Sequence, residues 1–176
     1  MKRIVCLLLC AMTGLAAGCR EAEEPAGQAA LDELTVRLSD GTEFPLTEMK
    51  DFFYTYDNIN YNAVYQRYRF YTEDGKLMFY HETREVKGNY GPAEEKDIKK
   101  KGTISLSAKR CAEFAAYLQE GTAKEREELV EDGDSGPWMY LYLINGDPKG
   151  LEFRFSSYEK ELAFKDFCAK LAAKGK

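Results

Sequence analysis

Tyrosine and arginine side chains gather in one stretch of this sequence, between residues 52 and 90. Tyrosine rings are rigid and amphipathic, and guanidinium groups donate several hydrogen bonds. A strand face that carries both can therefore recognise a protein, a peptide or a glycan. A structural role is the alternative, because tyrosine pairs also stabilise strands while their hydroxyl edges stay in water. The candidate binding residues are Tyr65, Arg67, Arg69, Tyr71, Tyr80 and Arg84.

Two cysteines, Cys111 and Cys168, lie on separate segments with helical periodicity. If the two helices lie side by side, a disulfide can join them and add roughly 4 kcal/mol in the chain-entropy description. The alternative is that both are small buried apolar side chains, which is the usual role of a free cysteine. No C-x-x-C spacing accompanies them, so we do not expect a disulfide oxidoreductase.

The remaining polar residue types limit the chemistry that the chain can perform. His81 is the one histidine of the sequence, which argues against His-rich metal sites and proton relays. A formal charge of -5 without a long basic block argues against a nucleic-acid partner. The acidic run at 127–134 fails the EF-hand spacing, because Pro137 stands at the sixth position counted from Asp132, where glycine is required. We therefore expect no metal site and no cofactor.

The N-terminus has the pattern of an export signal. A basic start is followed by the apolar run 4–12, which is shorter than the roughly 20 residues of a spanning helix and suits a secretory signal. The sequence Leu-Ala-Ala-Gly-Cys that ends at Cys19 resembles the lipobox of bacterial lipoproteins, with Leu15 one position further from the cysteine than is usual. The resemblance implies cleavage before Cys19 and a diacylglyceryl group on its thiol. An ordinary cleavable signal is the alternative, because small residues precede the same cut.

The lipoprotein resemblance also implies a location and a division of the chain. It implies export to the outer face of a bacterial membrane, either the cell membrane or an outer membrane, where acylated Cys19 is the anchor. The segment after Cys19 is polar and would reach about 20 Å as a flexible coil. Loss of Lys2 and Arg3 with the signal changes the formal charge from -5 to -7. We expect a signal peptide at 1–18, a lipidated cysteine and tether at 19–32, and a single domain at 33–176.

Period-two alternation and turn dipeptides predict a sheet built from hairpins. If the Asp74-Gly75 turn has two residues, Tyr68 faces His81 on a half-core face, and Arg67 faces Glu82 on a polar-aromatic face. Loops are expected at 90–101 and 123–137. The expected strands are 34–38, 44–46, 52–57, 63–86 as a hairpin, 103–106, 138–144 and 151–155.

Two amphipathic helices complete the expected fold. Ser107 is the expected cap of the first, and Gly121 is expected to end it. Ser156 begins a capping-box pattern before the second helix. On the expected strand 138–144, Trp138 is expected to anchor the core. Their apolar faces carry Cys111, Phe114, Ala115 and Leu118 in the first helix, and Phe164, Phe167, Cys168 and Leu171 in the second.

The patterns together predict an α+β fold, in which an antiparallel sheet carries both amphipathic helices on one face. The function that we expect is that of a membrane-anchored envelope lipoprotein with a non-enzymatic binding domain. The alternative is an envelope hydrolase with a carboxylate-based site, because the separation of two acids in space cannot be deduced from sequence.

Overall fold

The chain forms an antiparallel sheet that is backed by two helices. The computed structural model describes residues 31, 33–56, 64–85, 93–126 and 137–174. The strands are β1 (Thr35–Arg37), β2 (Glu43–Pro45), β3 (Met49–Tyr56), β4 (Val64–Glu73), β5 (Lys76–Glu85), β6 (Ile98–Ser105), β7 (Gly121–Glu125), β8 (Trp138–Leu143) and β9 (Leu151–Phe155). The helices are α2 (Ala108–Leu118) and α3 (Tyr158–Lys174), and the 3-10 turns are η1 (Leu46–Glu48) and η2 (Glu95–Asp97).

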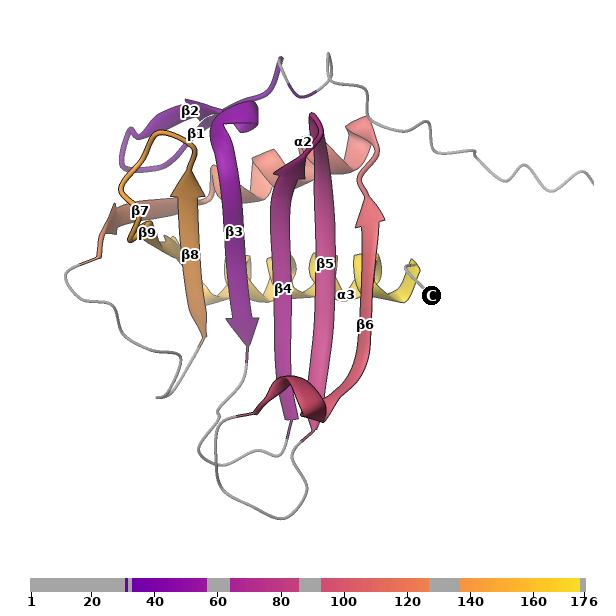
Figure 1. Ribbon diagram of the computed structural model, residues 1–176. Coiled ribbons are helices and arrows are strands. Elements are labelled where there is room, and N and C mark those ends of the chain that lie inside the picture. The colour runs from indigo at the N-terminus through magenta and orange to yellow at the C-terminus, as the bar shows by residue number, and fades with distance from the viewer. Residues whose placement is uncertain (1–30, 32, 57–63, 86–92, 127–136, 175–176) are drawn as a thin grey trace, which may run out of the picture.

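Seven strands pair in the order β6-β5-β4-β3-β8-β9-β7, and β1 and β2 form a separate two-stranded sheet. Every strand pair within the described ranges is antiparallel. Figure 1 shows α2 and α3 behind the same face of the large sheet, where they run across its strands. The predicted class, α+β with two helices on one face of an antiparallel sheet, is confirmed.

The β4–β5 hairpin closes on a two-residue turn, as the Asp74-Gly75 dipeptide predicts. Asp74 and Gly75 have φ values of 49° and 70°, and turns with two positive φ values match the right-handed twist of the flanking strands. The register places Tyr68 opposite His81, Arg69 opposite Tyr80, and Arg67 opposite Glu82. The predicted register is confirmed, and alternate residues of the hairpin therefore point to opposite faces of the sheet.

The core lies between the helices and the inner face of the sheet. Phe70 on β4 stacks on Phe114 of α2, with ring centroids 4.1 Å apart. Phe52 on β3 meets Phe114, Phe153 and Phe164 edge-on, at centroid distances of 5.8, 5.2 and 5.8 Å. Aromatic pairs of this kind contribute about 0.5–1.5 kcal/mol each beyond the area that they bury. All eight predicted helix-face residues are buried: Cys111, Phe114, Ala115, Leu118, Phe164, Phe167, Cys168 and Leu171.

Cys111 and Cys168 are both free thiols in this core. Burial raises the pKa of Cys111 to about 11, and burial raises the pKa of Cys168 well above its ordinary value. The structure therefore contains the two residues as buried apolar side chains, and not as the candidate disulfide.

His81 lies on the inner face of β5 and is buried. Its ring stacks on Phe79 with centroids 6.1 Å apart. Burial lowers the pKa of His81, and the charge of Lys100 lowers it further. Within the described part of the chain, Nε2 of His81 has no hydrogen-bond partner, so the neutral imidazole is the form that suits this position.

Side-chain caps begin both helices. The Ser107 hydroxyl accepts a hydrogen bond from the Arg110 amide at 3.4 Å, as predicted for α2. In α3 the cap is Ser157, which accepts from the Lys160 amide at 3.4 Å, and the expected cap Ser156 lies one residue earlier. Helix α2 ends at Leu118, three residues before the predicted Gly121.

Two edge strands occupy regions that the sequence indicates as loops. The expected loop at 90–101 contains η2 and the first half of β6, and the expected loop at 123–137 begins with the last residues of β7. Strand β6 carries three exposed lysines at 99–101. Lysine has a low β propensity, which is why the sequence does not indicate a strand here, but on an edge strand it prevents pairing with the strands of other chains. Gly121 is the first residue of β7, and a Cβ at this position would collide with the Phe153 ring. The acidic run at 127–134 lies outside the described residues.

Leu31 is buried against this core, although it falls within the expected tether at 19–32. The Leu34 amide donates to its carbonyl at 3.0 Å. No helix among the described residues is long and apolar enough to cross a membrane.

Candidate functional site

The face of the sheet opposite the helices carries rings interleaved with charges. The strand registers align Lys124, Glu152, Tyr140, Phe53, Arg69 and Tyr80 in one row across β7, β9, β8, β3, β4 and β5. A neighbouring row holds Trp138, Thr55, Arg67, Glu82 and Lys101. We call this surface the outer face. In Figure 1 the helices α2 and α3 lie behind the opposite face of the sheet.

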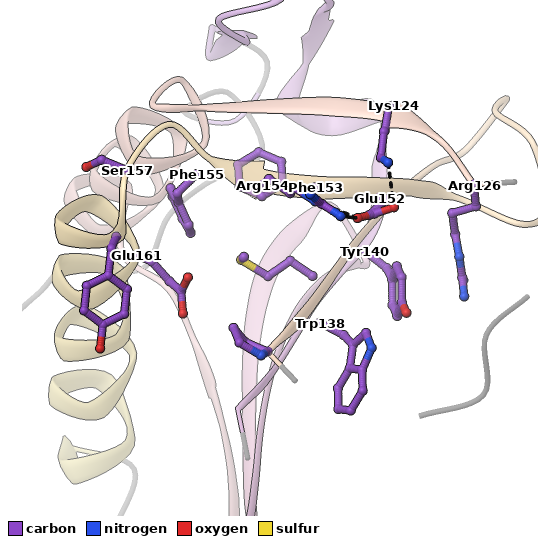
Figure 2. Close-up of a pocket in the computed structure, with 13 residues that line it drawn as sticks. Lys124, Arg126, Trp138, Tyr140, Glu152, Phe153, Arg154, Phe155, Ser157 and Glu161 are labelled. Atoms are coloured by element: carbon purple, nitrogen blue, oxygen red, sulfur yellow. Dashed lines mark hydrogen bonds and ion pairs between the residues drawn. The ribbon is translucent and has the colours of Figure 1, made fainter. Parts of the chain in front are cut away.

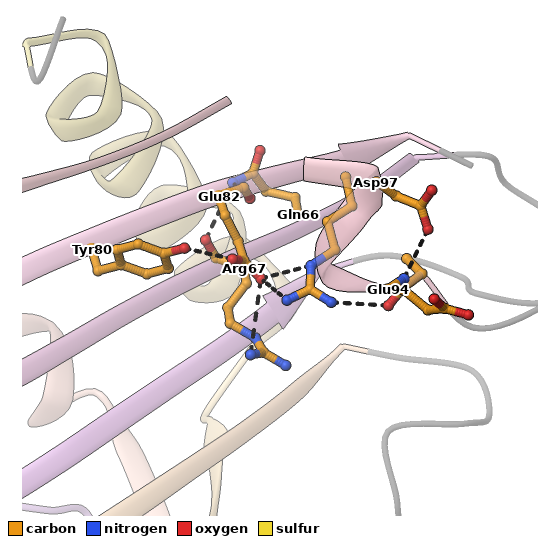
Figure 3. A network of polar contacts seen from close by, with 8 residues as sticks. Gln66, Arg67, Tyr80, Glu82, Glu94 and Asp97 are labelled. Atoms are coloured by element: carbon orange, nitrogen blue, oxygen red, sulfur yellow. Dashed lines mark hydrogen bonds and ion pairs between the residues drawn. The ribbon is translucent and has the colours of Figure 1, made fainter. Parts of the chain in front are cut away.

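A buried carboxylate organises the β4–β5 part of the outer face. The side chain of Glu82 is only 3% exposed. Its carboxylate accepts hydrogen bonds from the Tyr80 hydroxyl at 2.5 Å and from Arg84 Nε at 3.0 Å, and Arg67 lies 3.9 Å away (Figure 3). Burial raises the pKa of Tyr80 to about 12, and the hydrogen bond to Glu82 acts in the same direction. Arg84 also donates to the Ala93 carbonyl at 2.9 Å, so this cluster joins β5 to the segment before η2.

Arg69 forms a second paired site on the same face. Its Nε and Nη2 donate to the two carboxylate oxygens of Asp51 at 2.5 and 2.6 Å. Its guanidinium carbon lies 4.5 Å from the centroid of Tyr71 and 5.3 Å from that of Phe53. The hydrogen bond to Asp51 is the main reason that the pKa of Arg69 is raised. Bidentate pairing and stacking together hold the side chain in one orientation.

The structure brings together five of the six candidate binding residues on the outer face: Arg67, Arg69, Tyr71, Tyr80 and Arg84. Tyr65 pairs with Arg84 across the hairpin, and its side chain lies outside the described residues. The three arginines make ion pairs with acids of the same face. The guanidinium groups are therefore engaged within the sheet, and the tyrosine rings are the part of this face that a partner can contact.

A cleft opens beside this surface, where β8 and β9 separate. The two strands pair only at Tyr140–Glu152 and Leu141–Leu151 within the described residues. Beyond these pairs Trp138 and Met139 remain joined to β3, while Phe153 and Phe155 remain joined to β7. The gap between the strands is a cavity of about 770 Å³. Figure 2 shows it bounded by β8, β9 and the first turn of α3.

Cations line the β7–β9 side of the cleft around one carboxylate. Glu152 Oε1 lies 2.6 Å from Arg154, and Glu152 Oε2 lies 3.3 Å from Lys124. Burial favours the neutral form of Glu152, but the hydrogen bonds from Arg154 and Lys124 outweigh it and lower the pKa. Arg126 stacks 3.8 Å above the Tyr140 ring and donates to the Lys149 carbonyl at 3.2 Å.

A second carboxyl group, that of Glu161, enters the cleft from α3 (Figure 2). Its Oε1 accepts a hydrogen bond of 3.4 Å from the buried Tyr54 hydroxyl. Burial raises the pKa of Glu161, while Tyr54 and Lys165 oppose the shift. The cleft therefore contains one carboxyl group that binds protons more readily than usual and one, Glu152, that binds them less readily.

Aromatic side chains complete the walls. Trp138 is half-buried at the cleft and not enclosed in the core, so its expected role as a core anchor is wrong. Tyr158 on α3 lines the cleft and is exposed, and Leu162, one turn later, is exposed as well. The lining combines aromatic with charged side chains, and the volume lies within the range of about 300–1,000 Å³ that small-molecule sites have.

Sequence reasoning missed the cleft, although one signal for it was present. The alternation of Leu151, Phe153 and Phe155 with Glu152 and Arg154 predicts which β9 residues face outward. It contains no information that β8 and β9 separate after two pairs. In the part of the chain that the structure describes, no group of three or more His, Cys, Asp or Glu side chains is placed to hold a metal ion.

Comparison of the chain with protein-family models, with curated proteins and with solved structures finds no match. The class of protein is therefore defined by the fold and the site of this chain. The fold is an antiparallel sheet with helices on one face, and the site consists of an aromatic and charged outer face and a cleft between two diverging strands.

Proposed function

We propose that this protein is a lipid-anchored envelope protein whose domain binds a ligand in the cleft between β8, β9 and α3. The observation that carries the proposal is the cleft itself, about 770 Å³ in volume, with an aromatic wall, a cationic side and two carboxyl groups. Binding residues on rigid strands and a capped helix keep their geometry when the ligand is absent. The outer face beside it extends the surface on which a larger ligand can lie.

The anchor rests on the N-terminal sequence. The lipobox-like segment ends at Cys19, and the polar sequence after it leads to Leu31, which is buried in the core. Two acyl chains give stable membrane attachment. The Cys19→Ser chain is expected to lose acyl-lipid labelling and to leave the membrane fraction. Unchanged labelling and membrane retention would contradict the anchor.

The cleft contains its own spectroscopic reporter, because Trp138 is the one tryptophan of the chain. A suitable probe is 4-methylumbelliferyl β-glucoside together with the corresponding glucuronide, since the coumarin ring absorbs tryptophan emission. We expect saturable quenching of Trp138 in the full chain, held in a sugar-free non-ionic detergent. The Tyr140→Ala variant should weaken quenching, and Tyr80→Phe on the outer face should not. If neither glycoside quenches Trp138 saturably, the cleft is not a ligand site.

A second candidate function, glycoside hydrolysis, is favoured by the opposite pKa shifts of Glu161 and Glu152. A protonated acid and an ionised carboxylate in one cleft are the groups that such hydrolysis uses. Water would attack the anomeric carbon and give a proton to the Glu152 carboxylate, while Glu161 protonates the leaving oxygen as the glycosidic bond breaks. Binding is favoured over hydrolysis because both oxygens of Glu152 already hold cations. Release of fluorescent 4-methylumbelliferone by the native chain, lost in Glu161→Gln, would establish the hydrolase instead.

A further inference from the structure

We infer that the ligand of the cleft is a saccharide that carries an anionic group. Its anion lies against Lys124, Arg126 and Arg154, and its sugar ring lies against Trp138. The inference rests on the proposed function and specifies the ligand class of the same site. It follows from the charge, the exposure and the ring surfaces of the cleft.

The charge of the cleft is opposite to that of the chain. Three cations line it, and its carboxyl groups are those of Glu152 and Glu161, whereas the whole chain has a formal charge of -5. A local excess of cations attracts an anionic ligand to the cleft, although the protein as a whole is acidic.

The relative depth of these groups strengthens this preference. The side chains of Arg154 and Lys124 are 68% and 58% exposed, whereas the side chain of Glu152 between them is 29% exposed. An arriving ligand therefore meets the cations before the acid. The Arg154 guanidinium uses Nε and one Nη on Glu152, and a guanidinium has a second Nη that can donate to a carboxylate or a phosphate oxygen.

The opposite wall suits a sugar ring. Trp138 lines the cleft, and among the described residues its indole has no ring, cation or side-chain hydrogen-bond partner. A pyranose has an apolar face that packs on an indole and hydroxyl edges that need hydrogen bonds. The Glu161 carboxyl group and the Ser157 hydroxyl line the α3 side of the cleft, where they can supply such bonds. An aromatic wall, polar edges and a cationic rim together match an acidic sugar better than a plain apolar anion.

The test compares 4-methylumbelliferyl β-glucuronide with the neutral glucoside, which differ in one carboxylate. Quenching of Trp138 in the full chain by each glycoside gives the two dissociation constants. The Kd of the glucuronide is expected to be at least about ten-fold below that of the glucoside, and the difference is expected to shrink in high salt. Glucose 6-phosphate and glucuronate as competitors then distinguish a phosphate from a carboxylate as the preferred anion. Equal affinity for the two glycosides overturns the anionic inference while the cleft remains a ligand site. If neither glycoside quenches, the proposed function itself fails.

Charge variants give effects of opposite sign that a structural role would not produce. Arg154→Gln and Lys124→Gln are expected to weaken glucuronide binding about three-fold or more each, since both side chains are well exposed. Glu152→Gln is expected to strengthen it. Arg37→Gln is the matched control, because Arg37 pairs with Glu43 on the small β1–β2 sheet as Arg154 pairs with Glu152. Weakening by Arg37→Gln as well, or no strengthening by Glu152→Gln, would contradict the assigned contacts.

Discussion

Replacement of Glu82 by glutamine is expected to destabilise the fold, because it removes the one acid that the β4–β5 cluster encloses. The carboxylate lies 2.8 Å from Arg84 and 3.9 Å from Arg67. Removing one partner of a fully buried ion pair costs about 3–5 kcal/mol. Both arginines are only partly buried, so water screens part of the charge that is left, and we expect a loss of about 2–3 kcal/mol in the free energy of unfolding.

Urea unfolding followed by circular dichroism measures this loss, with the slope of the transition unchanged. The matched control is Glu43→Gln, which breaks the exposed pair with Arg37 and should cost less than about 1 kcal/mol. If Glu82→Gln costs no more than the control, the cluster does not hold the sheet together. The arginines of the outer face would then be available for a ligand, and our account of that face would be refuted.

Three further predictions concern the core. Iodoacetamide should label neither Cys111 nor Cys168 in the native chain and both after denaturation without reductant; failure to label after denaturation would reveal a disulfide. Because burial lowers the pKa of His81, the unfolded chain takes up its proton first, so stability should fall as the pH drops below about 6.5. His81→Phe should reduce this pH dependence, and an unchanged pH profile of unfolding would contradict it. Gly121→Ala should cost about 1–3 kcal/mol, since its Cβ meets the Phe153 ring, and a neutral effect on the melting temperature would argue against that contact.

The parts of the fold that were predicted correctly depend on signals between residues that are close in sequence, such as turn dipeptides and helical spacing. The Asp74-Gly75 turn fixes the hairpin register, and that register separates Tyr68 from Arg69 on opposite faces. Helical spacing identifies Phe114 and Phe164 as core residues because each helix buries one apolar stripe.

The missed parts depend on contacts that are distant in sequence. The second half of β6 coincides with the strand that was predicted at 103–106. The first half, at 98–101, is rich in lysine and has no hydrophobic alternation, and its backbone pairs along β5. The predicted register already places Glu82 opposite Arg67. The acid of Arg69 is different, because Asp51 lies on β3 and only the structure shows that the two residues pair. The cleft arises because β8 and β9 diverge after two pairs, which is a property of the assembled sheet.

The single indole N–H of Trp138 gives the most direct test of the cleft as the ligand site. In a ¹⁵N–¹H correlation spectrum of the full chain, this proton gives one side-chain indole cross-peak, because the sequence has one tryptophan. We predict that this peak moves saturably as glucuronide is added, together with the amides of Glu152 and Glu161, while the amides around Glu82 stay in place. Movement of the outer-face amides with an unchanged Trp138 peak would show that the ligand binds elsewhere and would contradict the central claim.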